Sequence, residues 1–158
     1  MASRIKKGTA AAGIVITLVG GFEGLRNYAY RDPVGIPTIC FGETRGVKMG
    51  DYETTAECKT MLGDRLIEFE TGIRKCLKDP DGVPLNPYIA SLSLSYNIGQ
   101  GAFCGSTVRK QLDAKNWPGA CDAILAWDKV RVAGVLVRLP GLTKRRQAER
   151  ALCLKDAA

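Results

Sequence analysis

Two acidic residues near the start of the chain stand in surroundings that favour opposite protonation states. Glu23 follows an apolar run from Thr9 to Phe22, and Asp32 comes nine positions later in a turn-rich segment. At the end of an apolar helix, the negative end of the helix dipole and poor hydration would both favour protonated Glu23. Asp32, in a polar turn, should stay ionised. Hydrolysis of a glycosidic bond requires such a pair, one carboxyl as the acid and one to activate water.

Thr38 lies six positions after Asp32 and offers a hydroxyl that could help to hold the water. The spacing alone nevertheless favours a simpler interpretation, in which Glu23 is a surface residue and Asp32 caps a turn. The chain contains no histidine, which excludes Ser-His-Asp and Cys-His nucleophile systems and any His-ligated metal site. We expect no metal and no cofactor, and acid–base chemistry must come from carboxylates, Lys, Tyr or Cys.

The composition is that of a folded, basic chain. Its 158 residues suit one domain, with room for two lobes, and a hydrophobic content of 46% excludes wholesale disorder. The net charge of +7 and the pI of about 9.2 indicate a polyanionic partner, either nucleic acid, anionic lipid or an anionic cell wall. Basic residues are scattered, except at 144–146, and are not interleaved with aromatic residues. We therefore expect no nucleic-acid partner, and we expect a monomer.

The sequence predicts an α+β protein that is mostly α-helical, with a small N-terminal β-hairpin lobe joined to the rest by a long central helix. Gly, Pro, Tyr and Thr are frequent in residues 23–50, and Asp32–Thr38 is typical of turns between short strands. Thr54–Glu57 forms a capping box, and apolar residues follow it at helical spacing as far as Leu77. Further helices are predicted at 87–98, 106–112, 118–127 and 143–154. Residues 129–140, with Val and Arg alternating around Gly134, favour neither helix nor strand clearly.

A longer motif surrounds the two carboxylates. The residues Glu23-Gly24, Ala29-Tyr30-Arg31-Asp32, Gly35, Thr38 and Gly42 stand in the order E-G-x4-A-Y-x-D-x2-G-x2-T-x3-G. This pattern resembles the phage-type lysozymes, glycoside hydrolase family 24. Segments at 95–99, 101–103, 106–107 and 142–150 are also similar to family segments and stand in the family order. The resemblance covers residues 23 to 154 approximately.

The resemblance implies a lysozyme-like fold and cleavage of the β-1,4 bond between N-acetylmuramic acid and N-acetylglucosamine in peptidoglycan. The family's general acid falls on Glu23, its water-orienting or water-activating Asp on Asp32, and its assisting Thr on Thr38. The family also places an arginine against the catalytic Glu, and Arg146 is the matching position. Thr44, Tyr96 and Ser106 match positions that touch sugar, although an ordinary structural role is an equally good interpretation of these three.

The N-terminus has the layout of an export signal. Arg4, Lys6 and Lys7 precede the apolar run, which is short, diluted by Gly and Ala, and has no small-x-small cleavage site. With catalytic residues directly after it, the segment resembles that of signal-anchor-release endolysins. Residues 1–22 would then be an uncleaved anchor and 23–158 the catalytic domain. The resemblance implies export by the host secretion machinery, residence on the periplasmic side of the host inner membrane, and later release into the periplasm. The alternative is an ordinary buried N-terminal helix of a soluble protein.

The six cysteines form no CxxC pair, and their even number and wide spacing indicate disulfides formed in an oxidising compartment. Buried free thiols are the alternative. Among the possible pairings we favour Cys76–Cys104 and Cys121–Cys153, which leaves Cys40–Cys58. Two positions depart from the family pattern: Cys40 stands where Gly is common, and Glu43 where His is common.

Two other functions remain open at this point. A lytic transglycosylase cleaves the same bond but needs no water-activating carboxylate, so Asp32 and Thr38 argue against it. A non-catalytic, membrane-tethered wall-binding protein would share the basic surface and the anchor. It would show no turnover, and replacing Glu23 with Gln would leave its behaviour unchanged.

Overall fold

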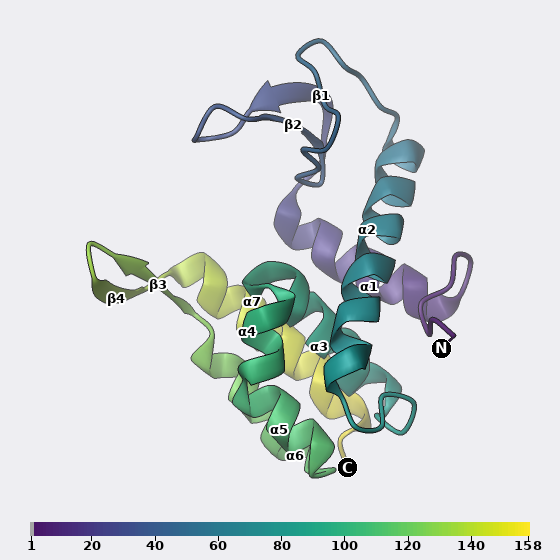
Figure 1. The fold of residues 1–158 in the computed structure, drawn as a ribbon, viewed down its shortest axis with the longest axis vertical. Helices are drawn as coiled ribbons and strands as arrows, with labels where there is room; N and C mark the ends of the chain where they lie inside the picture. Colours follow the sequence, from purple (N-terminus) through teal and green to yellow (C-terminus); the bar gives the residue numbers. More distant parts are fainter. Residues whose placement is uncertain (1) are drawn as a thin grey trace. The chain divides into compact units, whose positions relative to one another are not determined.

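The apolar N-terminal run folds into helix α1, Ala10–Glu23, in the computed structural model, which describes residues 2–158 (Figure 1). The Thr9 side chain caps its start by accepting a hydrogen bond from the Ala12 N–H at 3.1 Å. At its end, Gly24 has a positive φ of 74° and donates its N–H to the Gly20 carbonyl. Glycine adopts this backbone conformation without the steric cost of a side chain, so Gly24 stops the helix directly after Glu23.

A β-hairpin follows α1 and confirms the predicted N-terminal hairpin lobe. Strand β1, Arg26–Arg31, pairs antiparallel with β2, Pro37–Cys40, with Tyr30 opposite Thr38 and a register irregularity between Arg26 and Tyr30. The other edge of β1 pairs with the segment around Tyr52, through a bridge from Tyr28 and ring centroids 4.7 Å apart. The short hairpin therefore has hydrogen-bonding partners on both edges of β1.

Helix α2, Thr55–Cys76, is the long central helix. Its capping box forms as predicted: Thr54 N–H and hydroxyl both donate to Glu57 at 2.7 Å, and Glu57 N–H donates back to the Thr54 hydroxyl. The chain divides into two compact units within this helix, the first ending at Glu68 and the second comprising Phe69–Ala158.

The second unit is mainly helical. Its elements are α3 Leu85–Ile98, α4 Gln100–Gly105, α5 Thr107–Asp113, α6 Trp117–Ala123, the 3-10 helix η1 Ile124–Ala126, strands β3 Lys129–Val132 and β4 Val135–Arg138, α7 Pro140–Cys153 and the 3-10 helix η2 Leu154–Asp156. Helix α3 is buried along most of its length and packs against α7. It forms the centre of this unit's core, together with Phe103, Val108 and Ile124, which are completely buried.

Several boundaries in the second unit differ from the sequence prediction. Helix α3 begins at Leu85, so Pro87 lies inside its first turn, where a missing N–H costs no hydrogen bond. Gly99 ends α3 with a φ of 92° but also precedes α4, a helix that the sequence did not indicate. Pro140, rather than Thr143, opens α7 at a position that suits proline. The unassigned residues 129–140 contain a second hairpin, β3–β4.

Three disulfides are present, and they join the pairs that the sequence analysis favoured. Cys40–Cys58 links the end of β2 to α2 in the first unit. In the second unit, Cys76–Cys104 links the end of α2 to α4, and Cys121–Cys153 links α6 to α7. Each crosslink closes a loop in the unfolded chain, so each one lowers the conformational entropy that folding must overcome.

Candidate active site

Glu23 is the last residue of α1, and its side chain is partly buried. Only Gly24 and Leu25 separate it from the first residue of β1. The sharp stop that Gly24 imposes on the helix therefore fixes the point from which the Glu23 side chain leaves the backbone. Glu23 and Asp32 stand on either side of β1 along the chain.

Asp32 is held rigidly in the turn between β1 and β2. Its Oδ1 accepts hydrogen bonds from the N–H groups of Val34, at 3.0 Å, and Ile36, at 2.8 Å. Its own backbone donates to the Ile36 carbonyl at 3.0 Å and accepts from Gly35 at 2.9 Å. Within residues 2–158, the second carboxylate oxygen, Oδ2, makes no hydrogen bond. The turn thus uses one oxygen of Asp32 for structure and leaves the other for a ligand or water.

Thr38 lies directly beside this turn. It is a buried residue near the start of β2, and its hydroxyl donates to the Ile36 carbonyl at 3.0 Å. The same carbonyl accepts the Asp32 N–H. Asp32 and Thr38 are therefore joined through one peptide group, and the hairpin brings together two of the three predicted catalytic residues. Because the Thr38 hydroxyl donates its hydrogen bond to the Ile36 carbonyl, its lone pairs remain able to accept a hydrogen bond from water.

Thr44, a predicted sugar contact, lies in an exposed loop that Glu43 organises. The Glu43 carboxylate accepts hydrogen bonds from the N–H groups of Thr44, at 3.0 Å, and Arg45, at 2.9 Å, and pairs with the Arg45 guanidinium. Burial alone would raise the pKa of Glu43, but these hydrogen bonds outweigh it and hold the pKa below its usual value. Arg45 also pairs with Glu68 of α2 at 3.1 Å. The acidic residue that replaces the family's common His thus has an ion-pair partner of its own.

Two further predicted sugar contacts lie in the second unit. The ring of Tyr96, in α3, packs against that of Phe69 with centroids 5.0 Å apart and a tilt of 50°. Ser106 is buried and caps α5: its hydroxyl accepts from the Arg109 N–H at 3.1 Å and donates to the Phe103 carbonyl at 2.6 Å. Both residues have structural roles in addition to the predicted contacts with sugar.

Arg146 is completely buried in the second unit. Its guanidinium pairs with Glu149 at 2.7 Å and donates to the Asn97 side chain, at 3.0 Å, and to the Trp127 carbonyl, at 3.3 Å. Burial lowers the pKa of Arg146, and the neighbouring Glu149 carboxylate opposes that shift. Arg145 shares the same carboxylate at 3.3 Å. Two buried arginines therefore face one carboxylate, an arrangement that the i, i+3 spacing of Arg146 and Glu149 could have indicated and the sequence analysis missed.

No cluster of three or more Cys, Asp or Glu residues that could hold a metal ion occurs in the described part of the chain. The chemistry available in the first unit is that of Glu23, Asp32 and Thr38: a carboxyl at a helix end, a fixed carboxylate, and a hydroxyl beside it.

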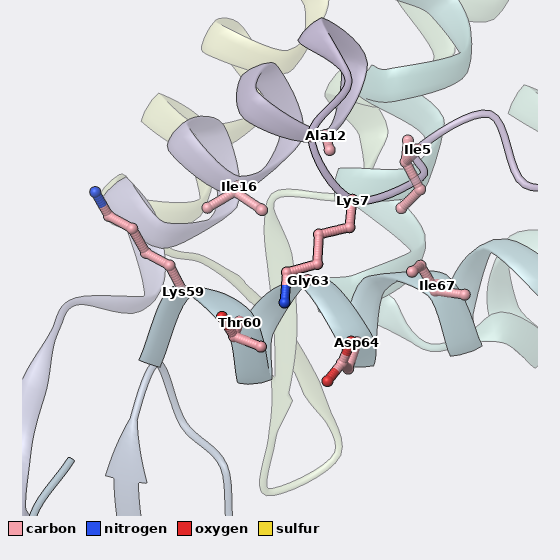
Figure 2. Close-up of a pocket in the computed structure, with 10 residues that line it drawn as sticks. Ile5, Lys7, Ala12, Ile16, Lys59, Thr60, Gly63, Asp64 and Ile67 are labelled. Atoms are coloured by element: carbon pink, nitrogen blue, oxygen red, sulfur yellow. The ribbon is translucent and has the colours of Figure 1, made fainter. Parts of the chain in front are cut away.

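The first unit also contains a cavity of about 150 Å³ between the N-terminal segment, α1 and α2 (Figure 2). Its lining mixes aliphatic side chains with polar ones: Ile5, Ala12, Ile16 and Ile67 on the one hand, and Lys7, Lys59, Thr60 and Asp64 on the other. Figure 2 shows Ile16 of α1 facing Gly63 of α2, where a small residue leaves space between the helices.

Comparison with known proteins identifies the class to which this fold and site belong. The model of the phage lysozyme family matches residues 20–149, and the chain belongs to this family. It is 36% identical over 152 residues to the SAR-endolysin of Pseudomonas phage phiKMV, which covers 96% of this chain and 92% of the relative. It is 40% identical over 144 residues to the endolysin of Salmonella phage P22, covering 88% and 94% respectively.

Among solved structures, the endolysin from Escherichia coli O157:H7 phage FAHEc1 superposes with a TM-score of 0.82 at 32% identity, over 93% of this chain and 94% of that one. The predicted lysozyme-like α+β fold is thereby confirmed. The chain is a lysozyme-type glycosidase of the phage endolysin group. These comparisons give no support to the lytic transglycosylase or to the non-catalytic wall-binding protein.

Proposed function

We propose that this protein hydrolyses the β-1,4 bond between N-acetylmuramic acid and N-acetylglucosamine in bacterial peptidoglycan and so lyses the host cell. One observation supports this best: two backbone N–H groups fix Asp32 through Oδ1, Oδ2 makes no hydrogen bond within residues 2–158, and the Thr38 hydroxyl donates to the same Ile36 carbonyl as the Asp32 N–H. Membership of the phage lysozyme family makes peptidoglycan the expected substrate.

In the proposed reaction, Glu23 donates its proton to the glycosidic oxygen as the bond from that oxygen to the anomeric carbon breaks. A water molecule attacks the anomeric carbon and passes one proton to Asp32 Oδ2. The other water proton faces the lone pairs of the Thr38 hydroxyl. Positioned acid–base groups of this kind contribute about 10²–10⁴-fold each to rate, and the ionised Asp32 also stabilises the positive charge that develops on the sugar.

Four further residues complete the proposal. Thr44, Tyr96 and Ser106 would contact the glycan, and Arg146 would be the charged partner of the catalytic acid. The fixed position of the Arg146 guanidinium, which is held by Glu149, Asn97 and Trp127, supports this role.

Turbidity loss of outer-membrane-permeabilised Gram-negative cells, with product masses from digested peptidoglycan, tests this function. We expect the wild type to clear the cells and to release reducing-end muropeptides. Glu23→Gln should abolish clearing, and Asp64→Asn, an acid on α2 outside the proposed site, should leave it intact. Clearing that survives Glu23→Gln would mean that another residue is the acid, and 1,6-anhydro products would establish a transglycosylase.

We further propose that residues 1–22 anchor the chain in the host inner membrane until release, and that the anchored state holds Glu23 away from Asp32 and Thr38. Relatives named SAR-endolysins, from phages phiKMV and P21, support this. So does the surface of α1, where Ile14 and Phe22 are exposed although Val15 and Val19 are completely buried. In the described residues, no helix has both the length and the apolar character that crossing a bilayer requires.

The packing of α1 in the folded state suits a reversible contact. The cavity against α2 lowers the number of close contacts that departure of α1 must break. At Gly20 the fit is close, since an added Cβ would lie 3.1 Å from the Phe41 ring, whereas Gly13 and Gly21 face open space. These two glycines can therefore be replaced without disturbing the folded form.

Gly13→Leu combined with Gly21→Leu tests the anchor, because leucine strengthens membrane residence by several tenths of a kcal/mol per residue relative to weakly apolar residues. We expect the variant to remain in the membrane fraction and to delay lysis, with full activity of the purified protein. Gly13→Ser combined with Gly21→Ser is the matched control and should release at least as readily as wild type. Unchanged release and lysis timing in the leucine variant would refute the anchoring role of residues 1–22. The proposal that the protein hydrolyses peptidoglycan would not be affected.

A further inference from the structure

The β3–β4 hairpin of the second unit has one aliphatic face and one cationic face. Its register places Lys129 opposite Arg138, Val130 opposite Val137, Arg131 opposite Leu136 and Val132 opposite Val135. Residues opposite one another in a sheet project to the same side, and successive pairs alternate sides. One face therefore consists of four valines: Val130, Val132, Val135 and Val137. The opposite face carries three basic residues and a leucine: Lys129, Arg131, Leu136 and Arg138.

The aliphatic side chains at the tip of this hairpin are uncovered. On the valine face, Val132 is 54% exposed, Val135 63% and Val137 39%, and on the other face Leu136 is 59% exposed. Figure 1 shows the hairpin extending beyond the helices of its own unit, from the N-terminal end of α7. Adjacent exposed aliphatic residues are unfavourable in water unless a partner covers them, so a contiguous group marks an interaction surface.

The charges around the hairpin specify the chemistry of that partner. From Lys129 to Gln147 the chain has six basic residues and no acidic one. Arg145 and Arg146 are buried against Glu149, so the other four, Lys129, Arg131, Arg138 and Lys144, are the ones that can face a partner. At the base of the hairpin, Asp128 pairs with Lys129 at 3.0 Å and Arg138 at 2.8 Å. Further out, Arg131 donates only to the Gly134 carbonyl, at 2.7 Å, and Lys144 makes no ion pair in the described part of the chain. Lys144, Arg138 and Thr143 line an open depression beside the hairpin.

We propose that this hairpin docks on the surface of a bilayer containing anionic phospholipid. With the tip of the hairpin inserted end-on at the boundary between acyl chains and headgroups, the exposed valines of one face and Leu136 of the other leave water, while Arg131 and Lys144 reach phosphates. A second copy of the chain would bring like charges together, and a glycan strand offers no apolar layer for four valines. The inference concerns the folded protein and does not depend on the anchoring role proposed for residues 1–22.

The test is flotation of the full-length, purified protein with vesicles of phosphatidylcholine, alone or with 30% phosphatidylglycerol. We expect binding to the anionic vesicles only, and weakening as salt rises. Val132→Thr combined with Val135→Thr keeps the β-branched shape of both side chains and should weaken binding about tenfold, because apolar burial is lost at each site. Arg131→Gln should weaken it about fivefold. Leu125→Thr combined with Leu154→Thr, two exposed leucines elsewhere in the unit, should bind like wild type.

Hydrolysis of isolated, lipid-free peptidoglycan separates this proposal from the enzymatic one, and every hairpin variant should match wild type there. Equal vesicle binding by wild type and the double valine variant would overturn the proposal and assign any membrane affinity to α1, which all variants retain. Equal binding to neutral and anionic vesicles would also overturn it. So would a concentration-dependent dimer, detected by light scattering, that the double valine variant loses, because a second copy would then cover the valine face.

Discussion

Cys40, at the end of β2, is bonded to Cys58 of α2 while its backbone has a φ of 60°. This is the left-handed region, which costs a residue with a Cβ about 1–2 kcal/mol and which glycine occupies freely. The conformation explains why glycine is common at this position in the family that the sequence resembles. In this chain the disulfide compensates for the strain, because it closes the loop between β2 and α2 in the unfolded state.

The two contributions at Cys40 can be separated by two variants without the disulfide. Cys40→Ala with Cys58→Ala should lose about 3 kcal/mol of unfolding free energy relative to wild type, the amount expected for a loop of this size. Cys40→Gly with Cys58→Ala should be more stable than that variant by about 1 kcal/mol, since glycine relieves the backbone strain. Urea unfolding measures both. Equal stability of the two variants would show that the positive φ carries no cost.

The two oxygens of Asp32 allow its structural and chemical roles to be distinguished. Asp32→Asn keeps an oxygen that can accept from Val34 and Ile36, so thermal stability should stay close to that of wild type. Activity should fall at least about 100-fold, because the amide cannot take a proton from water. Asp32→Ala should lose both activity and about 1–2 kcal/mol of stability, since two backbone N–H groups lose their acceptor.

Muropeptide release and thermal unfolding, measured on the same two Asp32 preparations, check this. If Asp32→Asn had activity near that of wild type, the Asp32 carboxylate would have no part in the reaction. Asp32→Asn that unfolds like Asp32→Ala would show that the charge, rather than the acceptor geometry, holds the turn.

Features that depend on a few neighbouring residues could be predicted from the sequence. The capping box of Thr54 and Glu57 forms, and the apolar helix ends at Glu23 as expected, because each feature is decided within one turn of helix. Helix α4 was missed because a glycine usually ends a helix, whereas Gly99 ends α3 and precedes α4. Strands β3 and β4 were not assigned from the sequence, because alternating valines usually predict a strand with one buried face, whereas three of these four valines are exposed.

For the candidate site, the sequence indicated which residues take part but not the contacts between them. Spacing and family resemblance indicated Asp32 and Thr38, but not that both bond to Ile36, because that depends on the hairpin register. The spacing of Arg145, Arg146 and Glu149 on α7 could have indicated their ion pairs. The burial of these charges depends on the packing of α3 against α7, which no local pattern encodes.

The capping box should make the stability of α2 depend on pH. Hydrogen bonds from the Thr54 side chain, and then from its backbone, lower the pKa of Glu57 below its usual value. A group with a lowered pKa in the folded state stabilises the fold above its unfolded pKa, about 4.3, and loses this effect as pH falls through the folded value. Wild type should therefore have a higher Tm than Glu57→Gln at pH 7, and the difference should disappear well below pH 4.

The same Tm comparison in a Thr54→Ala background supplies the control. The advantage of Glu57 over Gln should shrink there, because the hydroxyl that donates to the carboxylate is gone. A Tm difference that persists unchanged at low pH would show that Glu57 acts through helix propensity rather than through its charge.

The turn of the β3–β4 hairpin offers a local stability test. Ala133 and Gly134 both have positive φ, 47° and 83°, the combination of a type I′ turn, which favours Asn at the first position and Gly at the second. Ala133→Asn should therefore stabilise the hairpin by about 1 kcal/mol, and Ala133→Val should destabilise it by at least as much, since a β-branched side chain resists this conformation.

Hydrogen exchange at the Val132 and Val135 amides would report these changes locally. Since the hairpin makes few contacts with the helices of its unit, we expect the global Tm to change little in either variant. Faster exchange in Ala133→Asn than in wild type would contradict the turn assignment.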